Sequence, residues 1–544
     1  MKINEIENNL WSMANNLRGN MDASEYKNYI LGFMFYRFLS EKEEKYLVDQ
    51  KLVQPVGDES IAEAFKTAII EEGGGDSEEK MEEGWSDFEE DLLSGLGYAI
   101  KPQYLWATII KGVNDKTIEP STYQDAITSF DQIAKKNTKA ESDFRGIFNE
   151  MNLGADRLGP TTVERAKSLS RIVDLVDKTQ YVGDSGEDIL GEIYEYLIGQ
   201  FAANAGKKGG EFYTPHKVSE LIARIVTDGK EEDGSEFSVF DPACGSGSLL
   251  LTVGSRLNKD NKVGAVQYYG QELNTGTYNI GRMNLLMHNV IYQDMHLHNA
   301  DTLGRDWPDG PDAAGVDHPR MFDAVVENPP YSAKWSADES YTKDPRYKDF
   351  NGALAPKSKA DYAFLLDGLY HLNKKTGVMG IVLPHGVLFR GGTEGEIRKT
   401  LIDKNNIDTI IGLPANLFYG TSIPTIIMIL KKDLKNDRNI LFIDASQGFE
   451  KVKNKNELRD QDIDKIVETY RARKDVDKYA HLATYDEIES NDFNLNIPRY
   501  VDITEKEPPV DLDAVLAKIK QDDIEIDAAS KRIDEQLRIL KVIK

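Results

Sequence analysis

Short runs of β-branched residues alternate with helical stretches over residues 205–500, and this alternation constrains the fold more than any other feature of the sequence. Strands are predicted in FSVFD, VQYYGQEL, FDAVVE, GVMGIVLP, IDTIIGLP and TIIMILKK, whereas KVSELIARIV and DYAFLLDGLYHL have the apolar spacing of helices. Such alternation is typical of a doubly wound, mostly parallel α/β sheet. The chain has 544 residues, more than one ordinary core holds, which predicts two or three domains.

The regions on either side of this α/β segment are predicted to be helical. Apolar residues recur at helical spacing from Ile6 to Tyr46, and helical patterns continue to Ala205. Residues 71–90 are rich in glycine and strongly acidic, which favours a solvated loop there. We therefore expect a helical N-terminal domain at residues 1–170, an α/β domain at 171–505 and a C-terminal helical tail at 506–544.

The tail repeats its apolar residues in alternating steps of four and three, the spacing of a coiled-coil seam. The seam positions are Leu512, Leu516, Ile519, Asp523, Ile526, Ser530, Ile533, Leu537 and Leu540. Two interpretations stand at this point. The tail is either a helix that pairs with a partner, its polar seam positions setting the register, or a terminal helix packed on its own domain.

Charge and composition exclude several classes of function. Lys and Arg supply most non-specific affinity for DNA, so a chain with a formal charge of −26 should bind duplex DNA weakly without a basic partner. One cysteine, Cys244, excludes an internal disulfide or a Cys-rich metal cluster within one chain. The HLH sequence at 296–298 is predicted to be a polar turn and not a metal site. The lack of a long apolar run or an apolar leader predicts a cytoplasmic protein that does not enter membranes.

Polar motifs follow the predicted strands at their carboxyl ends, where sheets of this type bind ligands. DPACGSGS places Asp241 at a strand end, followed by Gly245 and Gly247 before a helix start, whose free N–H groups suit a carboxylate or phosphate. The next strand ends in Glu272, placed to accept from ribose hydroxyls. Asp301 in NADTL could accept from an exocyclic amine such as adenine N6, although such a residue alone is more often a helix cap.

The glycine loop also narrows the choice of cofactor. The GxxxxGK[ST] motif does not occur in the sequence, which argues against ATP hydrolysis by a P-loop. Nicotinamide cofactors stay open as an alternative, but GSGSLL lacks the third glycine of the dinucleotide fingerprint. An adenosine cofactor with a short charged tail fits the loop better.

The ENPPY motif, residues 327–331, ends another predicted strand. Pro329 and Pro330 each fix φ near about −65° and stiffen the turn. The side-chain oxygen of Asn328 and the carbonyl of Pro329 can therefore converge as two acceptors on one NH₂ group. Tyr331 adds a ring on which a flat substrate can stack. A rigid loop that only fills space is the alternative for a lone NPP triplet.

In combination these motifs are specific to a family. DPACGSG, GQELN, ADTL and NPPY, in that order after EFYTPH, resemble the amino-methyltransferases that transfer a methyl group from S-adenosylmethionine to adenine N6. More narrowly, LWSMANNLRGNMDASEYKNYILGFMFYRFLSEK, GGEFYTPHKVSELIARIV and LPANLFYGTSIPTIIMILKK are similar to the modification subunit of type I restriction-modification systems. The resemblance covers nearly the whole chain and implies a Rossmann-like, S-adenosylmethionine-dependent methyltransferase domain between a helical N-terminal domain and a C-terminal helix.

The resemblance also implies a role for each motif residue. The positions that match the family's cofactor site are Glu211, Phe212, Tyr213, Thr214, Pro215, His216, Asp241, Gly245, Ser246, Gly247, Glu272 and Asp301. The catalytic turn is matched by Asn328, Pro329, Pro330 and Tyr331. Phe418 occupies the place of a second ring against the flipped base, with Tyr419 and Phe389 as near rivals. No metal is implied.

The implied reaction is methylation of adenine N6 in double-stranded DNA, with the base flipped out of the duplex. The implied partners are the DNA, a separate specificity subunit that chooses the sequence, and a second modification subunit; the sequence leaves open whether a restriction subunit joins them. Outside the catalytic fold no extended segment is left to recognise a DNA sequence. Three rivals are a free-standing adenine DNA methyltransferase, a protein-glutamine methyltransferase and a non-catalytic assembly subunit, and the intact motifs argue against the last.

Overall fold

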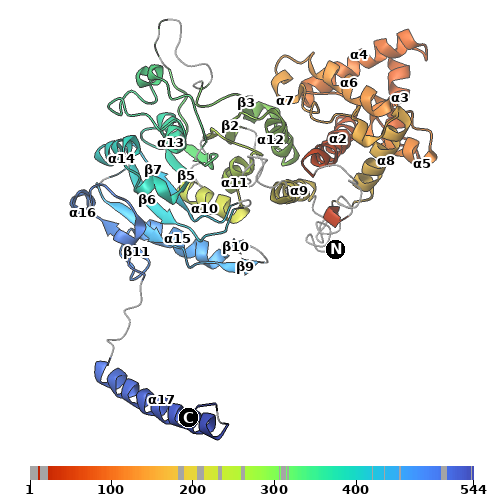
Figure 1. Ribbon diagram of the computed structural model, residues 1–544. Coiled ribbons are helices and arrows are strands. Elements are labelled where there is room, and N and C mark those ends of the chain that lie inside the picture. Colours follow the sequence, from red (N-terminus) through yellow and green to blue (C-terminus); the bar gives the residue numbers. More distant parts are fainter. Residues whose placement is uncertain are drawn as a thin grey trace. The chain divides into compact units, whose positions relative to one another are not determined.

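A computed structural model gives the arrangement of the chain, with N-terminal helices, a large sheet and a terminal helix in the expected order (Figure 1). The described residues are 10–12, 23–179, 181, 189–204, 214–230, 236–258, 264–304, 307, 314, 316, 318–331, 333–418, 421–433, 435, 437–452, 455–503, 511–540 and 542–543. Met1–Val501 forms one compact unit and Asp502–Lys544 a second.

The N-terminal region is helical, as predicted. Its elements are α2 (Ala23–Asp49), α3 (Ile61–Glu72), α4 (Glu78–Gly95), η1 (Pro102–Tyr104), α5 (Trp106–Asp115), α6 (Thr122–Ala134), α7 (Glu141–Phe144), η2 (Asp156–Leu158), α8 (Thr162–Lys178) and α9 (Leu190–Asn204). Helix α2 contacts α5, α8 and α9, and from Tyr29 to Ser40 it is buried on nearly all sides, which is typical of a helix in the interior. Its expected apolar face, including Ile30 and Met34, is fully buried.

The acidic segment is the one large error in the predicted secondary structure. Instead of a loop, it forms the end of α3 and most of α4, and only residues 73–77 make a turn. The side chain of Ser77 caps α4 by accepting from the backbone N–H of Lys80. Trp85 and Phe88 face inward and pack on Phe65, with ring centroids 6.1 and 5.2 Å away. The apolar spacing in EEKMEEGWSDFEEDLLSG therefore outweighs the acidic composition, and most of the carboxylates occupy the exposed face, whereas Glu89 is buried.

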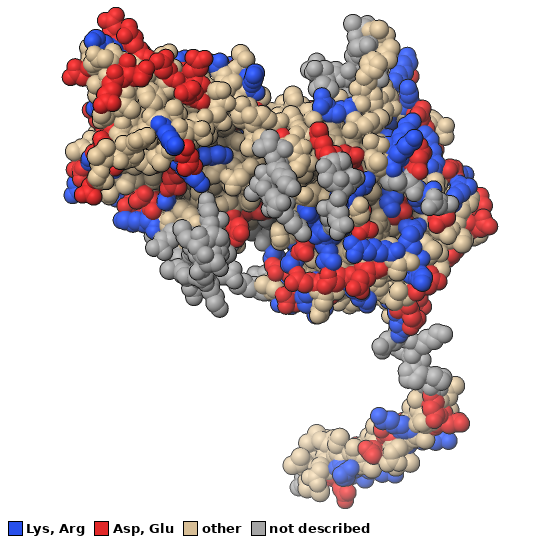
Figure 2. Space-filling model, turned by 180° about the vertical axis from the view of Figure 1, so that it is seen from behind, with Lys and Arg blue, Asp and Glu red and all other residues tan. Residues whose placement is uncertain are grey.

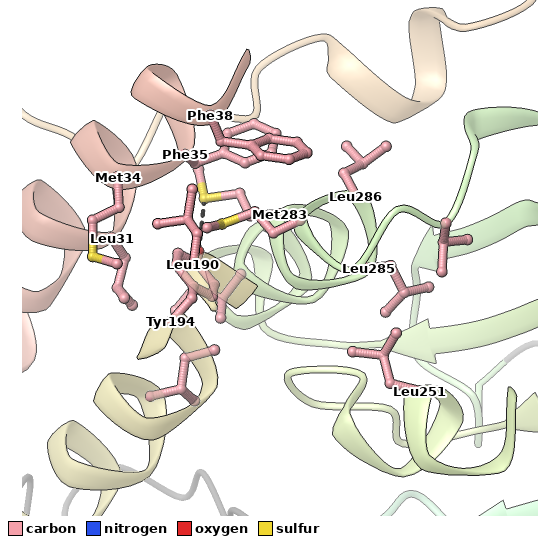
Figure 3. Packing of buried hydrophobic residues seen from close by; sticks show 14 of the residues in the cluster. Leu31, Met34, Phe35, Phe38, Leu190, Tyr194, Leu251, Met283, Leu285 and Leu286 are labelled. Carbon is pink, nitrogen blue, oxygen red and sulfur yellow. Dashed lines mark hydrogen bonds between the residues drawn. The ribbon is translucent and has the colours of Figure 1, made fainter. Parts of the chain in front are cut away.

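Helices α2, α9 and α12 (Thr275–Met287) join the N-terminal region to the sheet domain (Figure 3). Phe35 and Phe38 of α2 lie beside Met283 and Leu286 of α12, and Tyr194 of α9 donates its hydroxyl hydrogen to the Met283 sulfur at 3.2 Å. One hydrophobic cluster contains buried side chains of both regions, and a second cluster lies within the sheet domain. The helical region is therefore anchored directly to the helix that follows the second strand.

The α/β segment forms a nine-stranded sheet within the described residues, in the order β11-β8-β6-β7-β5-β4-β1-β2-β3. The strands are β1 (Phe237–Asp241), β2 (Val266–Glu272), β3 (Met295–Asn299), β4 (Ala324–Glu327), β5 (Val378–Pro384), β6 (Ile407–Gly412), β7 (Thr425–Leu430), β8 (Ile440–Asp444) and β11 (Ala480–Ala483). A separate hairpin pairs β9 (Glu450–Val452) with β10 (Lys455–Glu457). All six strands that the sequence predicts are present.

The sheet is mostly parallel, as predicted, because only β7 and β11 run against their neighbours. A parallel connection needs a crossover, usually through a helix. The described residues between β6 and β7 contain no helix, and β7 returns antiparallel between β5 and β6.

Helices cover both faces of the sheet. They are α10 (His216–Val226), α11 (Ser248–Leu257), α13 (Asp361–Tyr370), α14 (Thr393–Asp403), α15 (Asp460–Ala472) and α16 (Tyr485–Ser490), with short turns η4 (Tyr292–Asp294), η5 (Glu339–Lys343), η6 (His385–Leu388) and η7 (Ile497–Arg499). Gly380 of β5 faces α10, where an added Cβ would lie 2.9 Å from Ile222, whereas its neighbour Met379 faces Gly368 of α13. Alternation along the strand thus presents one face to α10 and the other to α13.

The predicted helical tail is confirmed as α17 (Leu512–Ile539), which begins at Asp511, whose side chain accepts from the N–H of Ala514. None of its residues is buried. Among the described residues, no helix has an apolar stretch long enough to cross a bilayer.

Candidate active site

The motifs meet at the point where the sheet changes direction. From β1 the chain adds β2 and β3 on one side and then returns to place β4 and β5 on the other. Strands β1 and β4 are therefore parallel neighbours, with Phe240 opposite Val325. The loops at the carboxyl ends of such neighbours diverge, and sheets of this class bind ligands between them, so we refer to this place as the crevice. DPACGSG follows β1 and NPPY follows β4, so both motifs lie at this crevice.

The glycine loop has the conformation that only glycine accommodates well. Gly245 and Gly247 have φ of +54° and +75°. A Cβ on Gly247 would also lie 2.4 Å from Leu285 Cδ1 of α12. The side-chain amide of Asn284 donates to the carbonyl of Ser246 at 2.9 Å, which fixes the loop from the same helix. Helix α11 begins directly after it, so the loop exposes a helix N-terminus to the crevice.

The two expected cofactor acids follow adjacent parallel strands. The Glu272 carboxylate at the end of β2 accepts from the backbone N–H of Gly245 at 3.1 Å and of Asn274 at 2.7 Å, which ties the glycine loop to the second strand. Asp301, two residues after β3, is exposed and accepts from the N–H of Leu303 at 3.2 Å. The loops that carry both acids thus lie at the same edge as the glycine loop.

Two buried carboxyls lie between these motifs, and only one of them was predicted. Asp241 is 2% exposed and accepts from the N–H of Ala243 at 3.0 Å. Burial, together with the charge of Glu272, raises its pKa to about 8. Glu327 is fully buried, and within the described part of the chain no donor reaches either of its oxygens. Burial, then Asp241 and Asp367, raise the pKa of Glu327 well above its ordinary range.

Glu327 escaped the sequence prediction because it was taken as the last residue of an apolar strand. Alternation along β4 directs Val325 and Glu327 to the same face, where Gly368 of α13 leaves space for them. The glutamate at the end of the run AVVE could have indicated a functional residue, because ionisable side chains are rarely buried fully unless they have a partner or a function.

Relative to the wild type, the variant Asp241→Asn should gain stability as the pH rises. The Asp241 pKa rises from 3.8 to about 8 on folding, so folding takes up a proton that the unfolded chain releases. Wild-type stability is therefore lost as pH rises toward 8 and then levels off, whereas asparagine has no such dependence. We expect the Tm of the variant to exceed that of the wild type by an amount that increases between pH 5.5 and pH 8. At pH 8 this difference should be about 3 °C or more. Calorimetry without ligand measures it, and a pH-independent difference would contradict a protonated Asp241.

A second buried network, not predicted from the sequence, joins the cofactor acids to the segment after NPPY. Arg346 is 3% exposed and pairs with Asp367 of α13 at 2.8 Å and with Asp344 at 2.8 Å. It also donates to the carbonyl of Thr302 at 2.7 Å, next to Asp301. The sequence around Arg346 does not indicate that this arginine is buried and paired. Two of its three partners, Thr302 and Asp367, are distant in the sequence, and an aspartate two residues away is common in polar loops.

The catalytic turn has its own hydrogen bonds. The Asn328 amide is 7% exposed, and its nitrogen donates to the hydroxyl of Thr214 at 3.0 Å. Its oxygen accepts from the Tyr331 hydroxyl at 2.7 Å. Burial, followed by the charge of Asp361, raises the Tyr331 pKa, so the phenol keeps its proton. The side-chain oxygen that the sequence assigns to a substrate amino group is thus occupied by Tyr331 in this structure.

The EFYTPH segment is described only in part. Glu211, Phe212 and Tyr213 lie outside the described residues. Thr214 is buried, and Pro215 precedes His216, the first residue of α10. Thr214 and Pro215 therefore lie at the N-terminal end of α10.

The structure separates the candidates for the second ring. Phe418 is 3% exposed and meets Tyr331 edge-on, with ring centroids 6.2 Å apart and planes at 82°. Phe389 is 47% exposed, and Tyr419 lies outside the described residues. Because the two rings are nearly perpendicular, Phe418 supports the Tyr331 ring and the two do not form parallel walls.

The prediction of a polar turn at HLH is wrong. His296 and His298 belong to β3, where His296 stacks on Tyr269 at 4.5 Å and His298 meets Trp307 edge-on at 4.3 Å. The alternation of histidine with leucine is that of a strand, which the polar composition concealed. Across the described residues, no group of three or more His, Cys, Asp or Glu side chains could hold a metal ion.

Comparison with known proteins agrees with this architecture. The family model described as N-6 DNA Methylase matches residues 185–508, and the HsdM N-terminal domain matches residues 6–176. The chain is 36% identical to the type I restriction enzyme MpnII methylase subunit of Mycoplasma pneumoniae, over 94% of this chain and 91% of the relative. The crystal structure of a type I restriction-modification methyltransferase subunit from Streptococcus thermophilus superposes with a TM-score of 0.81 and 42% identity, covering 92% of this chain and all of that one.

The chain therefore belongs to the N-6 DNA methylase family, and the predicted methyltransferase fold is confirmed. Within that family it is a modification (methylase) subunit of the type I restriction-modification class, an adenine-specific DNA methyltransferase. The relatives' names carry no information about individual site residues, and those roles rest on the geometry above.

Proposed function

We propose that this chain transfers a methyl group from S-adenosylmethionine to N6 of a flipped adenine in duplex DNA, at sites chosen by a separate specificity subunit. The observation that carries the proposal is the Asn328 amide, held beside the glycine loop at the switch point between β1 and β4. We also propose a location in the cytoplasm, which DNA as the substrate supports.

The residues around the crevice suit a cofactor that combines a ribose, an adenine and a positively charged tail. Gly245, Ser246 and Gly247 allow close approach to the backbone, and Glu272 has the position of a ribose-binding acid. Asp301 would accept from the adenine amine, and Asp241 with EFYTPH would lie near the charged tail. When bound, S-adenosylmethionine supplies a methyl group on a positively charged sulfur.

The catalytic turn would act on the adenine amino group. The N6 lone pair is delocalised into the ring, so the nitrogen is a poor nucleophile. The oxygen of Asn328 and the carbonyl of Pro329 would accept hydrogen bonds from its two N–H groups and concentrate electron density on the nitrogen, with Pro330 keeping the turn stiff. The Tyr331 ring, supported by Phe418, would stack on the flipped base.

Charge supports the need for partners. The chain carries −26 overall, and acidic side chains gather on α3 and α4 at the outer end of the helical region (Figure 2). Non-specific affinity for DNA depends on Lys and Arg, so a specificity subunit should supply much of the affinity as well as the sequence choice. A second modification subunit would complete the complex, and the relatives named above are likewise subunits of type I restriction enzymes.

The domain division follows from the same evidence. We assign residues 1–170 to a helical domain, 171–505 to the methyltransferase domain and 506–544 to a tail for subunit contact. The family matches at 6–176 and 185–508 support a division of this kind, and they change over near the end of α8, whereas residue 170 lies inside this helix. The exposed apolar seam of α17 supports its role as a contact helix.

The function can be tested by purifying the chain with a candidate specificity subunit and supplying methyl-labelled S-adenosylmethionine and DNA. We expect label in DNA, at N6 of adenine within one recurring sequence. Label in protein would instead indicate a glutamine methyltransferase, and donor binding without any transfer would indicate a non-catalytic assembly subunit. Site-specific labelling by the chain alone would indicate a free-standing enzyme.

A further inference from the structure

We propose that Thr214 is a positioning residue of the catalytic turn: its hydroxyl holds the Asn328 amide in the orientation that offers oxygen to the adenine amino group. This inference rests on the proposed function and deepens it. Sequence resemblance places Thr214 with the cofactor residues, whereas the structure gives it a direct hydrogen bond to the catalytic side chain.

The geometry isolates this pair from solvent. Thr214 and Asn328 are 8% and 7% exposed, and the amide nitrogen lies 3.0 Å from the Thr214 hydroxyl oxygen. The opposite end of the same amide accepts from Tyr331 at 2.7 Å. Each end of the amide therefore has a partner of its own, and the partner of the nitrogen is a residue 114 positions away in the sequence.

Both members of the pair have stiff backbones. Thr214 directly precedes Pro215 and Asn328 directly precedes Pro329, and a residue before proline is restricted to extended conformations. Threonine is also β-branched, which limits rotation about χ1. The Pro215 carbonyl accepts from the N–H groups of Val218 and Ser219 at 2.8 and 3.1 Å, so Thr214 is anchored at the start of α10.

The remainder of α10 secures this anchor against the sheet. The helix contacts β4 and β5, and Ile222 approaches the backbone of β5 at Gly380, where a Cβ would lie 2.9 Å from its Cγ2. Thr214 is thus held over the carboxyl end of β4 by a packed helix, and it does not depend on a free loop for its position.

The chemistry requires one of the two amide orientations. The adenine amino group presents two N–H donors, so Asn328 must offer its oxygen, and an amide turned by about 180° would offer N–H to N–H. In this orientation the Thr214 hydroxyl accepts from the amide nitrogen, so the buried nitrogen has a partner while the oxygen stays directed toward the substrate side. When an amino group arrives, it replaces the Tyr331 hydroxyl on the oxygen while the bond to Thr214 persists. Without Thr214 the buried nitrogen lacks an acceptor, and the amide can turn toward other partners.

The test uses the complex of this chain with its specificity subunit and compares Thr214→Val with Thr214→Ser. Valine keeps the shape and removes the hydroxyl, whereas serine keeps the hydroxyl. We expect Thr214→Val to lower kcat by about ten- to one-hundred-fold, the equivalent of one buried hydrogen bond lost in the transition state. The Kd for S-adenosylmethionine, measured by calorimetry, should stay within about twofold of wild type. Thr214→Ser should restore kcat to within about threefold of wild type.

Thr469→Val is the matched control. Thr469 lies in α15, is 7% exposed and donates one hydrogen bond, to the carbonyl of Lys465 at 2.7 Å. This variant tests the general effect of removing a buried hydroxyl group that lies far from the crevice. Its kcat should equal that of the wild type.

Three results would overturn the inference. The first is a wild-type kcat in Thr214→Val, and the second is a serine variant no better than valine. The third is a loss of affinity for S-adenosylmethionine as large as the loss of kcat, which would indicate that Thr214 acts as a cofactor-binding residue. If the wild-type complex itself does not methylate adenine, the proposed function falls and the inference with it, a result distinct from the other three.

Discussion

Asn328→Ala should lower the rate of methyl transfer to adenine by about 10²- to 10³-fold while the Kd for S-adenosylmethionine changes little. The substitution removes one of the two acceptors that converge on the amino group, and this acceptor acts on the reacting nitrogen as its charge changes. The glycine loop, Glu272 and Asp301 lie on other loops, after β1, β2 and β3. Methyl transfer and donor binding should therefore separate in this variant.

Single-turnover transfer by the complex measures the first quantity, and calorimetric titration of the donor measures the second. Asn137→Ala is a suitable control, because its amide also makes a hydrogen bond that is partly shielded from solvent, donating to the Leu93 carbonyl at 2.7 Å, but in the helical region. If Asn328→Ala lost the binding of S-adenosylmethionine together with methyl transfer, this would contradict separate roles for the catalytic turn and the cofactor residues.

Glutamate at two seam positions of α17, Ile519→Glu with Ile533→Glu, should separate the chain from its specificity subunit. The duplex methylation of the mixture should then fall to the low level expected of the isolated chain. Both side chains are largely exposed, at 50% and 59%, as is most of the apolar seam. Burying one isoleucine in an interface contributes about 1.5–3 kcal/mol, so two charges in the seam should weaken association by at least about 10²-fold.

Size-exclusion chromatography of the mixture and transfer to duplex DNA measure this effect. The control is Ile524→Glu, which places the same charge on the same helix at an equally exposed position off the seam, at 63% exposure. No α17 residue is buried, so the Tm of the isolated chain should not change in any of these variants. Site-specific duplex methylation by the purified chain, or normal association of the seam variant, would refute the role of α17.

Local patterns predicted the secondary structure well where spacing and composition agreed. The six strands, α10, α13 and the tail helix each have the apolar period expected for their type of secondary structure. The two errors arose where composition opposed spacing. In α4 the carboxylates suggested a loop, although Met81, Trp85, Phe88 and Leu92 recur at helical intervals. In β3 the histidines suggested a turn, although they alternate with leucine.

Part of the candidate site could also be predicted from the sequence. Gly247 and Glu272 were recognisable because a glycine before a helix and an acid at a strand end have local chemical reasons. Glu327 and Arg346 were not, because their importance comes from burial and from distant partners. The second ring was ambiguous in the sequence, and the contact of Phe418 with Tyr331 favours it over the exposed Phe389.

The sequence by itself determined which segments form strands and helices, the order of the motifs and the class of chemistry, because each depends on periodicity and on the steric and polar properties of neighbouring residues. Only the tertiary structure decided that the amide of Asn328 lies between Thr214 and Tyr331, and that Asp241 and Glu327 are buried behind it. These relations depend on the strand order around β1 and β4 and on the packing of α10 across the sheet. Local patterns do not encode such contacts, because they join residues that are far apart along the chain.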